Sequence, residues 1–183
     1  INYLIRLGWS HGDQELFTLN EMISLFDIKD INKSASALNQ SKLDWINQHY
    51  IKNMSAKQVA QALKWHFDQA GIEISKGPTL ETIIETHADR AKTLVEMFDQ
   101  SKFFYADFDE YDLKAAKKAL RGVALEPLAA VRGKLEALED WKAEPIHQAI
   151  ETVCSELDVG MGKVGQPLRV AVAGCGASPS IDI

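Results

Sequence analysis

The glycine-rich run Gly160–Gly165 has residue types and a spacing that could bind a phosphate group. Its three glycines fit the dinucleotide-binding fingerprint, in which backbone N–H groups hold a pyrophosphate. That fingerprint requires a strand before it, a helix after it and an acidic residue about 20 positions further on. The preceding apolar residues, including Ile146, Ile150 and Val153, recur at helical spacing, so the strand is missing. Phosphate binding is therefore the less favoured interpretation of this run.

Side chains for catalysis or metal binding are not gathered in any recognisable pattern. His11, Asp13 and Glu15 could be metal ligands, but no His pair at i, i+4 supports them, and a solvated turn is the better interpretation. Cys154 and Cys175 lie far apart without a Cys-x-x-Cys motif, and we expect reduced thiols. No Ser-His-Asp arrangement, Walker loop or spaced carboxylate pair is visible. We therefore predict no catalytic residue, no metal site and no cofactor in this chain.

Two stripes of basic residues at helical spacing are candidates for contact with phosphates. One stripe includes an aromatic ring and comprises Lys42, Trp45, His49 and Lys52. The other is the clearest basic ridge in the chain and comprises Lys114, Lys117, Lys118 and Arg121. Lysine and arginine neutralise phosphate charge, and aromatic rings pack on sugars or bases. The alternative for each stripe is an ordinary solvated face.

The composition restricts the class of protein. The 183 residues are 46% hydrophobic, which is ordinary for one globular domain or two small ones. No apolar run approaches the roughly 20 residues that span a bilayer, and no secretory signal is visible. We therefore expect a cytoplasmic protein without a membrane partner. The formal charge of −6 argues against a nucleic-acid binder as a whole, but the local basic faces are compatible with tRNA.

Helical periodicity dominates the chain and predicts an all-α fold of about eight to ten short helices. Four predicted N-caps begin these helices: Thr18, Asn39, Ser55 and Thr79, with Glu21 completing a capping box. The apolar residues after Thr18, Leu19 and Ile23 among them, are expected to face inward. Residues 80–98 are predicted as one helix, with Arg90 partway along it as an exposed or ion-paired surface residue. Four aromatic residues between Phe103 and Phe108 should pack at a boundary between two helical subdomains.

Several blocks of the sequence resemble bacterial glutamyl-tRNA synthetases, a family of class I aminoacyl-tRNA synthetases. In chain order these blocks are Asn2-Tyr3-Leu4 with Leu7-Gly8-Trp9-Ser10, Phe17-Thr18, Lys42-Leu43 with Trp45, Asn47, Tyr50 and Ile51, Arg90 with Thr93-Leu94, Gly165-Gln166-Pro167-Leu168-Arg169, and Ser178-Pro179. The likeness covers essentially the whole chain and respects its spacing. Each block alone is weakly specific, but together they are highly specific.

The resemblance implies an all-α, multi-helix anticodon-binding bundle in two subdomains, preceded by part of the helical stem-contact region. Residues 1–53 resemble the end of the stem-contact region, 54–110 the first anticodon-binding subdomain and 111–183 the second, truncated at its C-terminus. The ATP-binding motifs of the family, His-x-Gly-His and a Lys-Met-Ser-Lys-Ser-like loop, do not occur in the chain. We therefore expect a fragment that recognises tRNA(Glu) without charging it, while ATP and Mg²⁺ belong to a missing catalytic domain of the parent ligase.

The resemblance also assigns residues to the anticodon. Arg90 matches the arginine that reads the third anticodon base in discriminating enzymes, and a guanidinium can donate two hydrogen bonds to an unstacked cytosine. Four residues match positions that hold the first two bases: Arg169, Ser178, Pro179 and Ile181. Some members of the family have threonine where this chain has Ser178, which keeps the hydroxyl group and lacks the methyl group. The stripe residues that fall in the stem-contact part are Lys42, Trp45 and Lys52.

Two other functions stay open at this point. An all-helical adaptor could bind a partner helix through its aromatic residues. A nucleotide-binding protein could use Gly160–Gly165 instead. The leading hypothesis predicts tRNA(Glu) as the partner, no DNA, no membrane and a monomeric chain.

Overall fold

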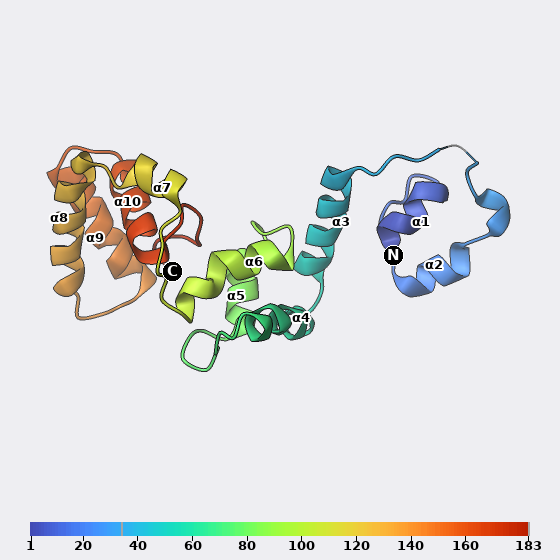
Figure 1. The fold of residues 1–183 in the computed structure, drawn as a ribbon, viewed down its shortest axis with the longest axis horizontal. Helices are drawn as coiled ribbons and strands as arrows, with labels where there is room; N and C mark the ends of the chain where they lie inside the picture. Colours follow the sequence, from blue (N-terminus) through green and yellow to red (C-terminus); the bar gives the residue numbers. More distant parts are fainter. Residues whose placement is uncertain (34, 183) are drawn as a thin grey trace.

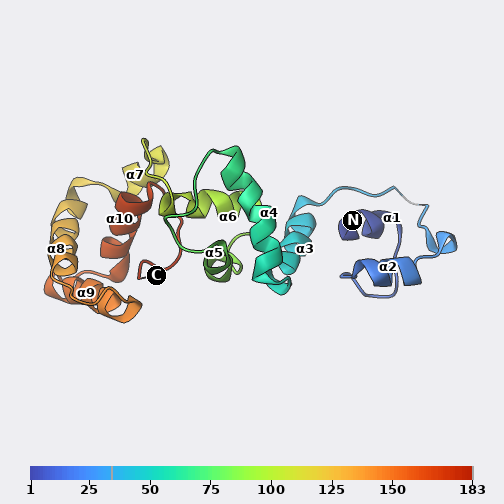
Figure 2. The same ribbon diagram turned by 90° about the horizontal axis from the view of Figure 1, so that it is seen from below.

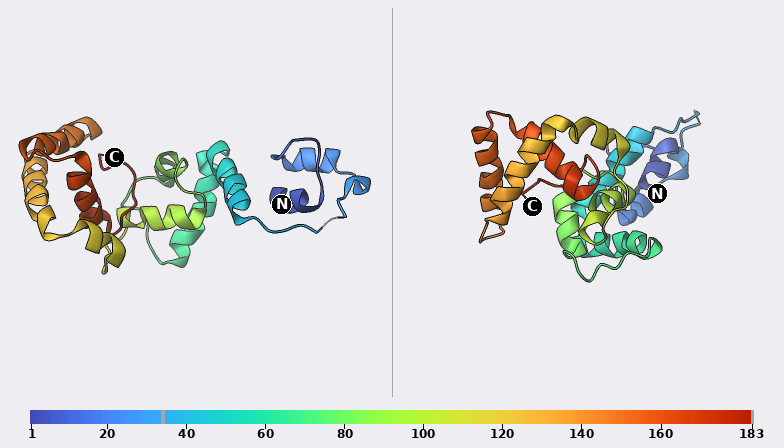
Figure 3. Two further views of the ribbon diagram at one scale, coloured as in Figure 1. Left: turned by 90° about the horizontal axis from the view of Figure 1, so that it is seen from above. Right: turned by 60° about the vertical axis from the view of Figure 1, so that its left-hand side comes forward.

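The computed structural model describes residues 1–33 and 35–182 and is drawn in Figure 1. Every regular element in these ranges is helical, as predicted: ten α-helices and three short 3-10 helices, with isolated bridges in place of strands. The helices follow one another in a row, so the molecule is elongated, and two further views agree (Figure 2, Figure 3). No described helix combines the length and apolar character needed to cross a bilayer.

The N-terminal region consists of two short helices, α1 (Asn2–Gly8) and α2 (Leu19–Leu25), around a small cluster of Trp9, Phe17 and Met22. Thr18 and Glu21 form the predicted capping box at the start of α2. The prediction that Leu19 and Ile23 face inward is wrong, since they are 59% and 72% exposed. A helix of seven residues buries only one side, and no described element covers the opposite side of α2.

Helix α3 (Gln40–Asn53) connects the N-terminal region to the middle of the molecule. Asn39 caps it, as predicted, by accepting a hydrogen bond of 3.1 Å from the backbone N–H of Lys42. Towards the N-terminal region, the Tyr50 hydroxyl lies 2.7 Å from the carbonyl oxygen of Phe17. On the other side, the Asn47 side chain donates to the carbonyl oxygen of Lys92. These contacts fix α3 between its two neighbours.

The middle bundle packs α4 (Ala56–Gln69), α5 (Leu80–His87) and α6 (Leu94–Ser101) around one apolar cluster. Its most buried side chains are Leu63, Phe67, Ile83 and Met97. Ser55 and Thr79 cap α4 and α5 as predicted. Phe104, which ends the short 3-10 helix Lys102–Phe104, and Tyr105, which follows it, pack on this cluster as expected. The Tyr105 hydroxyl donates to the carbonyl oxygen of Pro78.

The single helix predicted over residues 80–98 is wrong, because the chain leaves the helix after His87 and begins a new one at Leu94. Thr93 accepts a hydrogen bond from the backbone N–H of Glu96, whose carboxylate in turn accepts from the backbone N–H of Lys92. A threonine three residues before a glutamate is a helix-start signal in its own right. Arg90 therefore lies in a turn between two helices, where its backbone N–H donates to His87.

The C-terminal bundle contains α7 (Leu113–Ala119), α8 (Leu125–Glu136), α9 (Ala143–Glu156) and α10 (Met161–Ala173). Its core consists of Val131, Ile150, Val153 and Val164. The run Gly160–Gly165 forms the cap and first turn of α10, and the regular element before it is a helix, not a strand. The structural context of the dinucleotide fingerprint is therefore absent from this part of the chain.

A left-handed turn at Gly174 ends α10 and sends the chain back across the bundle. Gly174 has a φ angle of +70°, and its carbonyl oxygen accepts a hydrogen bond of 2.8 Å from the backbone N–H of Asp112. A Cβ atom at this position would lie 2.7 Å from the ring of Phe108. Both the backbone angle and the close approach therefore require glycine.

A buried histidine lies beneath the turn that carries Arg90. The His87 side chain is fully buried, and its Nδ1 lies 2.8 Å from the carbonyl oxygen of Ile83. Because a carbonyl only accepts, Nδ1 carries the proton, and Nε2 is left buried without a partner in the described residues. Burial lowers the pKa of His87, and the hydrogen bond to Ile83 only partly opposes that effect.

We predict that the free energy of unfolding decreases when the pH is lowered through the ordinary pKa of histidine, near 6.5. The native state resists protonation of His87, whereas the unfolded chain takes up the proton, so this contribution is complete above pH 6.5 and is lost below it. Urea unfolding at pH 7.5 and 5.5 measures the change. His87→Gln should flatten the pH dependence, and His11→Gln, at an exposed position, should not. An equal pH dependence in all three proteins would contradict the prediction.

We also predict that Gly174→Ala destabilises the chain by at least about 1–2 kcal/mol, the cost of placing a side chain in the left-handed region. The comparison is Gly133→Ala within α8, where a Cβ atom would meet nothing within 4 Å. That substitution should stabilise the helix, by up to about 1 kcal/mol. Urea unfolding of the two variants should therefore give changes of opposite sign. A neutral Gly174→Ala would show that the turn is not constrained as described.

Candidate nucleic-acid interface

Two arginines from different bundles meet on one short C-terminal segment. Arg90 donates from Nη1 to the carbonyl oxygen of Ser178 at 3.1 Å. Arg169 donates from Nε to the Ser178 hydroxyl at 2.9 Å and from Nη2 to the carbonyl oxygen of Pro179 at 3.3 Å. The structure thus brings together four of the five residues predicted for the anticodon.

Three separate elements position these groups. The turn between α5 and α6 presents Arg90, and the last two turns of α10 present Arg169. The left-handed turn at Gly174 returns the chain so that Ser178 reaches both side chains. Beyond it, Ile181, the fifth predicted residue, packs against the core of the C-terminal bundle. The site depends on packing in both bundles.

Both guanidinium groups keep their charge and most of their donors. Arg90 is exposed and Arg169 is half-buried. Neither has a carboxylate within ion-pair distance in the described part of the chain. A guanidinium carries five N–H donors, and the contacts above use one from Arg90 and two from Arg169. Further donors therefore remain for acceptors on a ligand.

The end of the segment is fixed by polar contacts. The Ser180 hydroxyl donates to the carboxylate of Asp182, which also lies 3.4 Å from Nδ1 of His147 on α9. The hydrogen bond from Ser180, and to a smaller extent the nearby His147, lower the pKa of Asp182. Pro179 is buried between the two tethered regions. The segment is thus held on both sides of Pro179 before any ligand binds.

The stripe on α3 is largely neutralised by acidic partners. Lys42 forms an ion pair with Glu15, and its Nζ lies 4.2 Å from the centre of the Trp45 ring. The hydrogen bond from Lys42 is the main reason that the pKa of Glu15 is lowered. Lys52 pairs with Asp89 at 2.5 Å, next to Arg90. These partners come from other elements, so sequence spacing within α3 does not show them.

The basic ridge is divided by the end of α7. Its lysines, Lys114, Lys117 and Lys118, lie on α7, are exposed and have no ion-pair partner in the described ranges. The expectation that Arg121 continues the same helical face is wrong, because Leu120 leaves the helical conformation with a ψ angle of 54°. Arg121 begins the 3-10 helix Gly122–Ala124 instead.

Sequence reasoning expected Phe108 to pack at the boundary between the subdomains, but it missed the specific contacts that hold the interface in place. The Phe108 ring packs against Gly174, and Asp112 binds the carbonyl oxygen of the same glycine. Thr93 and Glu96 define the turn of Arg90. Only the last pair has a recognisable signal, because threonine and glutamate at this spacing form a helix start.

Comparisons with known proteins agree with this geometry. Residues 56–183 match the family described as "Anticodon binding domain". A solved glutamate tRNA ligase from Elizabethkingia meningosepticum is 30% identical, with a TM-score of 0.79 over 99% of this chain and 36% of its own. A glutamate-tRNA synthetase from Elizabethkingia anophelis is also 30% identical, with a TM-score of 0.75 over 99% of this chain and 35% of its own.

The chain therefore spans little more than a third of the length of these two solved relatives. The likeness extends over nearly all of its own residues, and the family match covers the middle bundle, the C-terminal bundle and both arginines. The resemblance drawn from the sequence is confirmed. The chain belongs to the anticodon-binding domain family.

Proposed function

We propose that this chain recognises tRNA(Glu) as the C-terminal part of a glutamate–tRNA ligase, which would use ATP to attach glutamate to that tRNA. The observation that carries the proposal is the pair Arg90 and Arg169, which meet at Ser178 with donors to spare and no carboxylate partner in the described residues. The family match and the names of the two solved relatives support it.

The anticodon would bind at the meeting point of the two bundles. The planar guanidinium of Arg90 would read the edge of the third, unstacked base. Arg169 and the Ser178 hydroxyl would hold the first two bases, and Ile181 would supply apolar contact beside them. Pro179, being buried, would mainly shape the segment. Contacts within the protein already hold these side chains in place. Binding the RNA would therefore cost them little conformational entropy.

Contacts with the phosphates of the stem would come more from α7 than from α3. The α7 lysines have no carboxylate partner in the described residues, whereas Lys42 and Lys52 each have one. Trp45 is 44% exposed and could pack on a sugar. An unpaired exposed lysine attracts a phosphate more strongly than one already neutralised by a neighbour.

Residues 1–33 and 35–182 hold no group of three or more His, Cys, Asp or Glu side chains that could bind a metal ion, and the glycine run is helical. In this proposal ATP and Mg²⁺, which the ligase reaction would use, bind to another part of the ligase. The proposed role of this chain is RNA binding by a monomer, without DNA. The adaptor alternative is not favoured, because Phe104 and Tyr105 pack against the middle core.

The first test changes Arg90. Arg90→Gln should remove about 1–3 kcal/mol of discrimination at the third anticodon base, because it replaces a two-pronged donor. Affinities for anticodon stem-loops that differ only at that base measure the effect. Arg132→Gln is the control, since Arg132 is exposed on α8 and paired with Glu136. Equal affinity of the unmutated chain for both RNAs would refute the assignment.

A second test separates phosphate contact from base reading. If Lys117 faces phosphates, Lys117→Ala should weaken binding to every stem-loop alike and make the plot of log affinity against log salt concentration shallower by about one unit. Lys57→Ala, at an exposed position of α4, should change neither quantity. An unchanged salt dependence for Lys117→Ala would identify the α7 face as merely solvated.

A further inference from the structure

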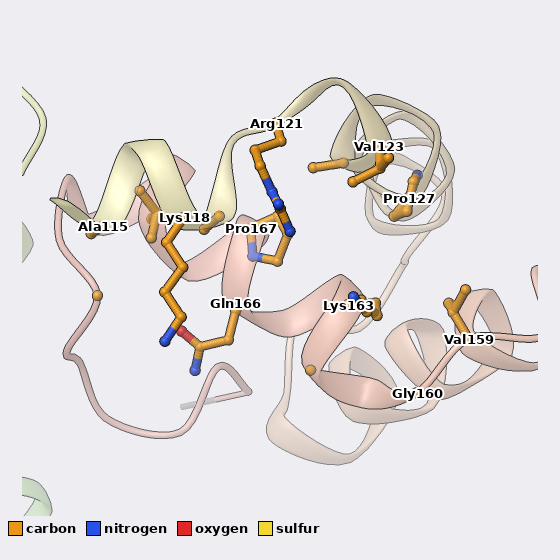
Figure 4. Close-up of a pocket in the computed structure, with 15 residues that line it drawn as sticks. Ala115, Lys118, Arg121, Val123, Pro127, Val159, Gly160, Lys163, Gln166 and Pro167 are labelled. Carbon is orange, nitrogen blue, oxygen red and sulfur yellow. The ribbon is translucent and has the colours of Figure 1, made fainter. Parts of the chain in front are cut away.

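A groove of about 1000 Å³ lies between α7, the start of α8 and α10 (Figure 4). Its lining is largely apolar, and the buried apolar residues that form its floor are Ala124, Pro127, Pro167 and Val170. Its rim carries three basic residues: Lys118, Arg121 and Lys163. None of the lining residues is acidic. This volume is at the upper end of the range for ligand sites, so the groove has room for a ligand.

The charge of the rim is not cancelled by the protein. In the described ranges none of the three basic side chains has a carboxylate within ion-pair distance, although the whole chain has a formal charge of −6. Figure 4 shows Lys118 extending toward Gln166, and Arg121 extending over Pro167. An apolar surface beside unpaired cations complements a ligand that combines the flat face of a heterocyclic ring with a negative charge.

The groove adjoins the arginine interface. Gly176 lines it, and Gly176 belongs to the segment that leads to Ser178. Lys163 lies six residues before Arg169 on α10, which corresponds to about 9 Å along the helix axis. The two side chains leave α10 about 120° apart around its axis, so an RNA strand held at Arg169 would turn around the helix to place a neighbouring nucleotide at the groove.

From these observations we infer that the groove binds one unstacked nucleotide of the same RNA loop, outside the three bases of the anticodon. Its base lies on the apolar floor, and its phosphate is held by Lys118, Arg121 and Lys163. This inference rests on the proposed function and adds to it a contact that does not read the anticodon. Apolar contact with the face of a base makes no hydrogen bonds to the base edge, so the groove contributes affinity without discrimination.

The first arm of the test removes charge from the rim. Lys163→Gln in the 183-residue chain should weaken binding to an anticodon stem-loop RNA and reduce the salt dependence by about one unit. The ratio of affinities for RNAs with different third anticodon bases should not change. Lys57→Gln on α4 is the matched control and should bind as the unmutated chain does.

The second arm removes bases from the RNA. Among stem-loops that each lack a single base outside the anticodon, one should bind the unmutated chain at least about fivefold more weakly. Ala119→Trp, which fills the groove, should bind the complete RNA more weakly than the unmutated chain does. Its affinity should not fall further for the stem-loop that lacks the critical base. Circular dichroism checks the fold of this variant; if it does not fold, Ala115→Leu, a smaller filling of the same lining, takes its place in the comparison.

The outcomes separate this inference from the proposed function. Suppose that Lys163→Gln binds the RNA with unchanged affinity and salt dependence, while Arg90→Gln changes base discrimination. The inference about the groove would then be wrong, and the proposal of anticodon recognition would still hold. Failure of the unmutated chain to bind the stem-loop would overturn both. If Lys163→Gln lost binding to a polyglutamate peptide but not to the RNA, the groove would belong to an acidic protein partner and the inference would be wrong.

Discussion

The hydrogen bonds from Arg90 and Arg169 to the segment at Ser178 and Pro179 are the interaction on which the interface depends. Both arginines donate to carbonyl or hydroxyl oxygens and not to carboxylates. A neutral acceptor orients a guanidinium without cancelling its charge. Of these contacts, the one from Arg90 joins the middle bundle to the C-terminal segment. The fold therefore holds its binding groups in place and leaves them electrostatically active.

The distribution of ion pairs explains how an acidic chain can present basic surfaces. On α3 the cations of Lys42 and Lys52 are matched by Glu15 and Asp89, which come from other elements. On α7 and at the start of α10 the lysines have no such partner in the described residues, and acids are absent from the lining of the neighbouring groove. The net charge of the chain is a poor guide to whether it binds RNA. Salt screens distant charges, so the unpaired charges close to the ligand dominate the interaction.

Patterns among residues close together in the sequence predicted most helix starts. Contacts between residues far apart in the sequence were not predicted. The caps at Thr18, Asn39 and Ser55 were predicted because each involves residues only three positions apart. The break between His87 and Leu94 was missed although no large apolar residue lies between Ile84 and Leu94, and although Thr93 and Glu96 have the spacing of a helix start. The resemblance named the residues of the interface, but their meeting at Ser178 depends on tertiary packing. Neither spacing nor composition contains that information.

The turn that carries Arg90 has a consequence for how base preference could diverge among related proteins. Its shape is set by backbone hydrogen bonds and by the Thr93 cap, while the Arg90 side chain is exposed and makes one protein hydrogen bond. Exchanging an exposed side chain usually changes folding stability by less than about 0.5 kcal/mol. If Arg90 reads a base, as proposed, a single substitution at this position would alter which RNA is accepted while the scaffold stays intact, so selectivity and foldability would evolve separately.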